Sequence, residues 1–184
     1  MKSNNDNRQS PAQRLGILAQ TGLFLATILA VQFLSLPNWL TGSAVNAVFI
    51  FVFLHLGRRY ANFLAVLSPP GALISGHLPP VMYPLLPVII IGNLLLINTY
   101  FLLFKGKIFA RYLVPSLSKA AFIFVAGMGL IRWFDIGEKV KWLILPVIGV
   151  QIVTALAGIF IGEKLYAVLN CRGENAASEL GRNR

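Results

Sequence analysis

Six apolar runs separated by short polar segments make up most of the chain, at roughly 15–36, 44–57, 61–77, 81–104, 113–133 and 142–166. The first, fourth, fifth and sixth reach the ~20 residues that a helix needs to cross a bilayer. The second is shorter. The third contains Ser68-Pro69-Pro70-Gly71, and prolines remove backbone donors and bend a helix. The pattern predicts an all-α integral membrane protein, a six-transmembrane-helix bundle with a bent third helix that other helices shield.

Composition agrees with a lipid environment. The 184 residues are 57% hydrophobic and only 12% charged, whereas soluble domains carry about 25% charged residues. A net charge of +10 raises the question of nucleic-acid binding. The basic residues are spread over short loops and tails, with no basic helix, so we expect them to meet anionic lipid and expect no nucleic-acid partner.

The distribution of basic residues predicts the orientation. Thirteen of the 16 would lie on one side of a six-span bundle: Lys2, Arg8, Arg14, Arg58, Arg59, Lys105, Lys107, Arg111, Lys119, Lys164, Arg172, Arg182 and Arg184. The positive-inside rule then places both termini in the cytoplasm of a multi-pass plasma membrane protein. The expected organisation is a cytoplasmic N-terminal tail (1–14), a membrane domain (15–166) and a cytoplasmic C-terminal tail (167–184). In this scheme Lys119 lies just inside the fifth span.

Several chemistries lack their residues in this sequence. There is no His-Glu-x-x-His, no Gly-x-Ser-x-Gly and no phosphate-binding Walker loop, and no apolar run carries an acidic pair. We therefore expect no enzyme activity, no cofactor and no metal site. We also expect a chain that does not energise transport by itself, because a proton-coupled transporter favours a buried carboxylate.

Neutral polar and aromatic side chains form the candidate ligand site. They gather in or beside the outer half of the predicted bundle: Gln32, Trp39, Asn46, His77, Tyr83, Asn93, Trp133 and Gln151. One interpretation is a hydrogen-bonding cavity with an aromatic rim that opens outward. The alternatives are that each amide joins neighbouring helices at about 0.6–2 kcal/mol, that the tryptophans form an interfacial belt, and that His77 is a loop residue. Because Arg132 is the only arginine in that layer, we expect no strongly anionic ligand.

A strip of small residues suggests a second surface. Gly22, Ala26 and Ala30 recur every four residues along the first apolar run, which lets another helix approach closely. The strip either packs inside the same bundle or docks a separate subunit. Gly158 and Gly162 form a similar, weaker candidate on the sixth run.

Three segments resemble those of a known family. They are Leu40-Thr-Gly-Ser-Ala-Val-Asn-Ala47, Leu67-Ser-Pro-Pro-Gly71, and Gly76-His-Leu-Pro-Pro-Val-Met-Tyr-Pro-Leu-Leu-Pro87 with Ile91-Gly92-Asn93 following it. Together with six apolar runs in about 180 residues, they are similar to segments of the substrate-binding S-components of energy-coupling factor (ECF) vitamin transporters. The resemblance covers most of residues 15–166.

The resemblance implies a function and partners. S-components bind a micronutrient from outside and dock on a membrane coupling subunit that carries two cytoplasmic ATPases. The family's first helix has an Ala-x-x-x-Ala docking motif, which Ala26-Thr-Ile-Leu-Ala30 matches. The family's pocket uses the loop after the first span and the outer parts of spans three to six. The Met-His hook of nickel and cobalt members is absent, since Lys2 follows Met1, which argues against a free metal ion as cargo.

The resulting hypothesis is a substrate-capture subunit of an ECF-type ABC importer for a vitamin- or cofactor-like molecule. The alternative is a structural membrane protein of the rod-shape or cell-division scaffold kind, which needs no outward cavity. A small self-sufficient permease is a third possibility. The residues do not identify the ligand.

Overall fold

The structure is a computed structural model that describes residues 10–34, 36–76, 80–133 and 138–182. Side chains are described over the same ranges except at 81–82, 131, 138–148 and 172–182.

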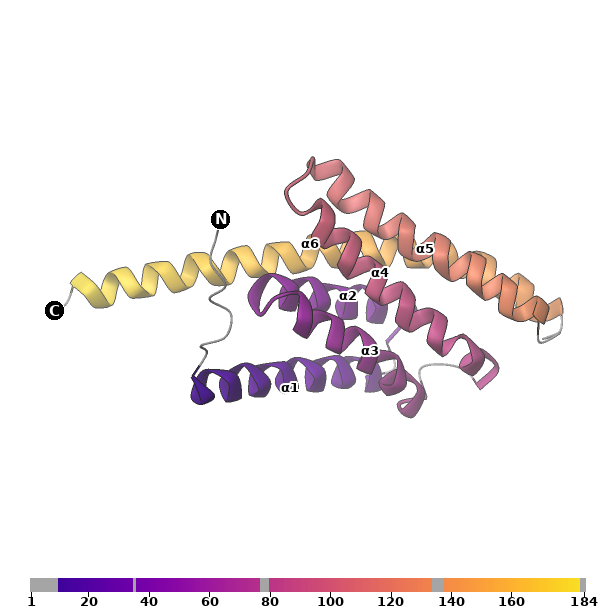
Figure 1. The fold of residues 1–184 in the computed structure, drawn as a ribbon, viewed down its shortest axis with the longest axis horizontal. Coiled ribbons are helices and arrows are strands. Elements are labelled where there is room, and N and C mark those ends of the chain that lie inside the picture. Colours follow the sequence, from indigo (N-terminus) through magenta and orange to yellow (C-terminus); the bar gives the residue numbers. More distant parts are fainter. Residues whose placement is uncertain (1–9, 35, 77–79, 134–137, 183–184) are drawn as a thin grey trace.

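All regular structure in the described part of the chain is helical (Figure 1). The elements are α1 (Pro11–Phe33), α2 (Asn38–His55), α3 (Arg58–Ile74), the 3-10 helix η1 (Pro80–Leu85), α4 (Leu86–Leu103), α5 (Ile108–Trp133) and α6 (Glu138–Arg182). This confirms the prediction of an all-helical chain. The helix boundaries differ from the apolar runs by a few residues because polar residues at the ends, such as those of the Ser10–Gln13 capping box, join the helices.

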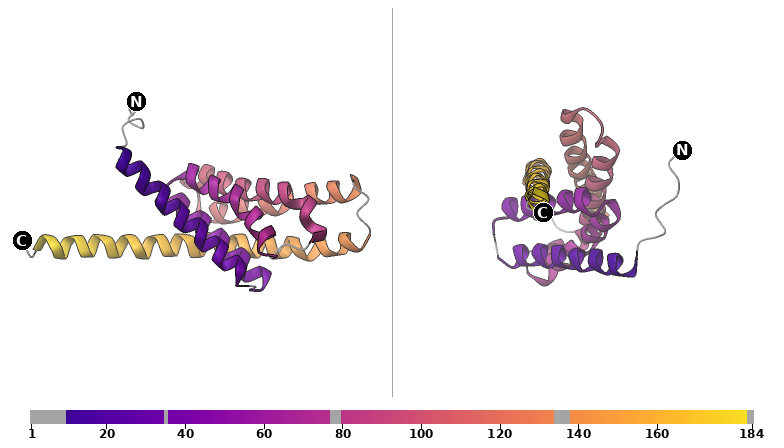
Figure 2. Two further views of the ribbon diagram at one scale, coloured as in Figure 1. Left: turned by 90° about the horizontal axis from the view of Figure 1, so that it is seen from below. Right: turned by 90° about the vertical axis from the view of Figure 1, so that its left-hand side faces the viewer.

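The helices run back and forth between two ends of the bundle. We call the end that holds the α2–α3 and α4–α5 connections the basic end, since Arg58, Arg59, Lys105 and Lys107 lie there (Figure 1, left). α2 packs extensively on α6, and α5 packs on both α4 and α6. α1 crosses the others obliquely at the edge of the bundle and contacts mainly α2 and α3 (Figure 2).

Within the described residues, five helical segments are long and apolar enough to cross a membrane: Pro11–Phe33, Asn38–His55, Tyr83–Leu103, Ile108–Leu130 and Gly149–Cys171. They indicate a multi-pass membrane protein. α3, with 17 residues, is shorter than each of these segments. It continues as one α-helix across Pro69 and Pro70. A sixth span, a bend in α3 and the orientation of the termini remain predictions.

The core is apolar and lies along α2. Its fully buried members include Phe49, Ile50 and Val52 of α2, with Leu64, Leu96, Ile97, Tyr100, Ala155 and Ile159 from the neighbouring helices. Outside this core, many large apolar side chains are exposed, as expected for a surface that lipid covers.

α6 continues as a helix to Arg182, past the last apolar run and beyond the basic end of the bundle (Figures 1 and 2). The segment that we expected to be a polar tail after residue 166 is therefore helical over most of its length.

Candidate functional site

A buried lysine lies in the middle of the bundle. α5 begins at Ile108, so Lys119 is about 16 Å along this helix and about 21 Å from its end at Trp133. Its side chain is 3% exposed. Lys119 therefore lies further from the start of its helix than from the start of the apolar run at 113, and neighbouring helices enclose its side chain. The side of the membrane on which it lies remains a prediction. A lysine at the centre of a membrane helix costs about 2.5–3.5 kcal/mol on insertion scales, so it is a candidate functional residue.

Asn46 of α2 is the hydrogen-bond partner of this lysine. Lys119 Nζ donates to Asn46 Oδ1 at 2.9 Å, and the Asn46 side chain is 2% exposed. The other end of the amide, Asn46 Nδ2, is buried without a hydrogen-bond partner. A buried donor without an acceptor costs free energy, so Asn46 Nδ2 is a second unusual polar group at the same place.

Glycines of two neighbouring helices make room for this pair. A methyl group at Gly158 of α6 would overlap Asn46 Cβ and come within 3.0 Å of the Ala47 nitrogen. A methyl group at Gly92 of α4 would meet Ile123 Cδ1 at 2.9 Å and Lys119 Cγ at 3.7 Å. Four helices therefore meet closely around Lys119 and Asn46.

Two further buried polar residues lie on the helices that surround the pair. Asn93 follows Gly92 on α4 and is buried, and Thr154 lies one turn before Gly158 on α6 and packs against Gly42 of α2. We call Asn46, Asn93, Lys119 and Thr154 the central polar layer. Gln151 is half-buried one turn before Thr154 on α6, and its backbone oxygen accepts a hydrogen bond from the Thr154 hydroxyl at 3.2 Å.

Gln32 joins two helices. Its Nε2 donates to Ser68 O and Ser68 Oγ of α3, each at 3.1 Å, beside the Pro69–Pro70 pair. The same side chain leaves Oε1 buried without a hydrogen-bond partner. These contacts match the interpretation of Gln32 as an amide that holds α1 to α3.

The aromatic candidates lie on the surface toward the opposite end of the bundle. Trp39 and Tyr83 are exposed, and Trp133 is 84% exposed. The structure therefore does not bring them together with the central polar layer. His77 lies outside the described residues.

A charged cluster near the basic end was not anticipated from the sequence. Glu163 of α6 accepts hydrogen bonds from Tyr100 of α4 at 2.5 Å and Tyr112 of α5 at 2.8 Å, and pairs with Arg111 of α5 at 3.0 Å. In the sequence, Glu163 lies near the end of the sixth apolar run and has no visible partner. The cluster links α4, α5 and α6, so the contacts of the Glu163 carboxylate join these three helices.

The two small-residue strips lie in different environments. Gly22, Ala26 and Ala30 are exposed on α1, and a methyl group at Gly22 would meet no atom within 4 Å. They lie about 100–180° around the helix from the buried residues Thr21 and Ile28. By contrast, Gly158 and Gly162 of α6 are buried against α2. The second candidate docking surface is therefore an internal contact.

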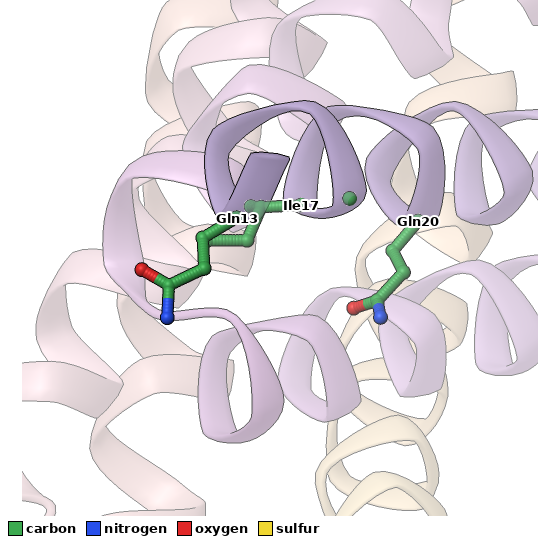
Figure 3. Close-up of a pocket in the computed structure, with 4 residues that line it drawn as sticks. Gln13, Ile17 and Gln20 are labelled. Carbon is green, nitrogen blue, oxygen red and sulfur yellow. The ribbon is translucent and has the colours of Figure 1, made fainter. Parts of the chain in front are cut away.

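Two surface hollows lie away from the central polar layer. One, of about 360 Å³, lies on α1 beside Gln13, Gly16, Ile17 and Gln20, and the two glutamines point to the same side of the helix (Figure 3). The other, of about 580 Å³, lies near the basic end and is lined mainly by apolar and aromatic side chains of α2 and α4.

The arrangement offers hydrogen-bonding groups that are suited to binding. Within the described residues, no group of three or more His, Cys, Asp and Glu side chains is arranged to hold a metal ion. The central polar layer offers donors and acceptors in an apolar surrounding, which is how small-molecule sites achieve orientation and specificity.

Comparisons with models of protein families, with curated proteins and with solved structures found nothing that matches this chain. Its class is that of an all-helical chain with several helices suited to crossing a membrane.

Proposed function

We propose that this chain is the substrate-capture subunit of an ECF-type importer. It binds a vitamin- or cofactor-like small molecule from outside and delivers it by docking on a coupling subunit with two ATPases. The termini then lie in the cytoplasm, the basic end faces inward, and the opposite end, with Trp39, Tyr83 and Trp133, faces outward.

The central polar layer is the observation that carries this proposal. Lys119, Asn46 and Asn93 are buried in an apolar bundle, and Asn46 Nδ2 has no partner. Burying a lysine in a membrane bundle is costly, so a buried lysine beside an unpartnered amide donor favours a functional site over a contact that only joins helices. A ligand that enters the bundle supplies the missing partners.

The exposed strip on α1 supports the docking part. Gly22, Ala26 and Ala30 face away from the rest of the bundle, so a second helix can reach them without rearrangement of this chain. The match of Ala26–Ala30 to the docking motif of S-components adds to this argument. A partner is also required because the sequence has no nucleotide-binding loop of its own.

The docking part is tested by adding bulk to the strip. Ala26→Leu should abolish co-purification of the ATPase-linked partner from membranes of the native host in mild detergent, because the added side chain prevents close helix approach. Thr27→Leu is the matched control, since Thr27 is also exposed but lies about 100° further around α1.

Two results would count against this proposal. If wild-type protein recovers no ATPase-linked partner, the importer assignment is wrong and a structural scaffold gains support. If Ala26→Leu and Thr27→Leu recover the partner equally, the docking surface lies elsewhere.

A further inference from the structure

Among the side chains that the structure describes, no carboxylate pairs with the buried Lys119. Six acidic residues exist in the chain, and Glu163 is the one whose side chain the structure describes. Glu163 is occupied by Arg111, Tyr100 and Tyr112. Tyr112 precedes Lys119 by seven residues on α5, which separates the two levels by about 10 Å along the helix.

Three of the remaining carboxylates lie on parts of α6 that are far from this level. Glu138 begins α6 and precedes Gly158, which contacts Asn46, by about 30 Å of helix. Glu174 and Glu179 lie on the part of α6 that extends past the bundle, and Asp6 precedes α1. The polar contact of Lys119 among the described side chains is the neutral oxygen of Asn46.

The Asn46 amide is suited to exchange this contact for another. A lysine ammonium only donates hydrogen bonds, so the amide oxygen must face it in the present arrangement. This leaves Asn46 Nδ2, a donor, buried and unpartnered on the same side chain. An oxygen anion placed beside both groups would accept from Lys119 Nζ and Asn46 Nδ2 together, which satisfies the charge and the free donor at once.

We propose that Lys119 and Asn46 are the anion-recognition centre of the ligand site, and that the ligand carries a carboxylate. The inference rests on the proposed function and names its substrate class. It refines the expectation of no strongly anionic ligand, which depended on Arg132 being the only arginine in the outer layer, because a carboxylate carries a single charge. In the ligand-free protein, Asn46 Oδ1 occupies the place that the carboxylate takes when it binds.

A single negative charge fits this centre better than a phosphate ester. The described cation at the central polar layer is Lys119 alone, and the next cation on α5, Arg111, is paired with Glu163. Phosphate groups carry up to two charges and are usually held by several donors or an arginine fork. The amide and threonine groups of Asn93 and Thr154 supply neutral hydrogen bonds to the remainder of such a ligand.

The first experiment is mass spectrometry of small molecules extracted from purified, full-length protein. The wild-type extract should contain a carboxylic acid, and Lys119→Met should lose it. Lys105→Met is the matched control, because Lys105 is exposed at the basic end and should retain it. Thermal unfolding of the emptied proteins checks folding, and Lys119→Met should unfold at or above the wild-type temperature, since replacing a buried charge by an apolar side chain often stabilises.

The second experiment is a thermal-shift titration with matched pairs of a carboxylic acid and its amide. The pairs are nicotinate with nicotinamide and benzoate with benzamide. Inorganic phosphate and any acid found in the extract are titrated in the same way. We expect a carboxylate to stabilise wild-type protein and its amide to bind about 10- to 100-fold more weakly, the range of a charged hydrogen bond.

Asn46→Asp separates recognition from structure. The new carboxylate would pair with Lys119 inside the protein, so the variant should stay folded and lose the external anion. A structural role for the Lys119–Asn46 bond alone would leave ligand binding intact in this variant.

The outcomes distinguish this inference from the proposed function. A neutral ligand retained by Lys119→Met overturns the anion centre and leaves the capture function standing. An anion that binds only as phosphate, or one that Asn46→Asp still binds, also overturns it. If a carboxylate binds as expected but no ATPase-linked partner is recovered, the anion centre stands and the importer assignment is wrong. If neither experiment finds a bound molecule, the anion centre and the capture function are both refuted.

Discussion

The contact between Gly158 and α2 offers the sharpest test of how the helices meet. In Gly158→Ala the new methyl carbon would lie 3.0 Å from the Ala47 nitrogen and overlap Asn46 Cβ. Non-bonded carbon atoms prefer about 3.5–4.0 Å, so the overlap with Asn46 Cβ requires α6 to move away from α2 by about 1–1.5 Å. Backbone atoms form this contact, so it is not relieved by a side-chain rotation. Overpacking of this kind costs about 1–3 kcal/mol.

The same helix provides a control for the intrinsic effect of the substitution. Gly149→Ala adds a methyl group where no atom lies within 4 Å, so only the higher helix propensity of alanine acts, at about 1 kcal/mol in favour of folding. Because both substitutions gain the same helix propensity, the two variants should differ by the overpacking cost alone, about 1–3 kcal/mol in the free energy of unfolding.

The assay is unfolding of the detergent-solubilised protein followed by circular dichroism, with size-exclusion chromatography to confirm that each variant is folded at the start. For a domain of this size, 1 kcal/mol corresponds to about 2–4 °C in Tm. Gly158→Ala should melt below wild type and Gly149→Ala at or above it. Equal melting temperatures for the two variants would refute the close α2–α6 contact.

Two further variants test the polar contacts. Glu163→Gln should destabilise the protein by about 1–3 kcal/mol, because Arg111 then keeps a half-buried charge without its carboxylate. A double-mutant cycle with Arg111→Met measures the coupling, and a coupling near zero would contradict the ion pair. Gln32→Leu should cost about 1 kcal/mol in chemical unfolding by removing its bonds to α3, whereas Gln20→Leu, at an exposed site, should be neutral. Similar losses for both glutamines would mean that the α1–α3 contact is wrongly assigned.

The all-helical class could be predicted because it depends on local hydropathy, which a single sequence displays. The position of Lys119 along its helix could not. The apolar run begins at 113, after the basic residues Lys105, Lys107 and Arg111, whereas α5 begins at Ile108. Starting five residues earlier puts Lys119 about 7.5 Å further from the start of its helix.

Partners far apart in sequence were also beyond prediction. Asn46 and Lys119 are separated by 73 residues, and no periodicity links two helices in this way. One feature of the sequence pointed to an unusual position for Lys119, because this lysine is flanked by Ser118, Ala120 and Ala121 inside an apolar segment.

Small-residue spacing alone did not distinguish an external strip from an internal one. Gly22 with Ala26 and Gly158 with Gly162 show the same four-residue spacing, yet the first pair is exposed and the second is buried on α2. The difference arises from the position of each helix in the bundle. α1 lies at the edge, whereas α6 packs along α2 over much of its length.

The continuous α6 helix carries the single thiol of the chain. Cys171 is exposed on the segment that projects past the basic end, and no other cysteine exists. A membrane-impermeant maleimide applied to intact cells therefore reports, on the unaltered protein, which compartment this projection occupies. Labelling that occurs only after the cells are opened would fix the projection, and the whole basic end with it, on the inner side.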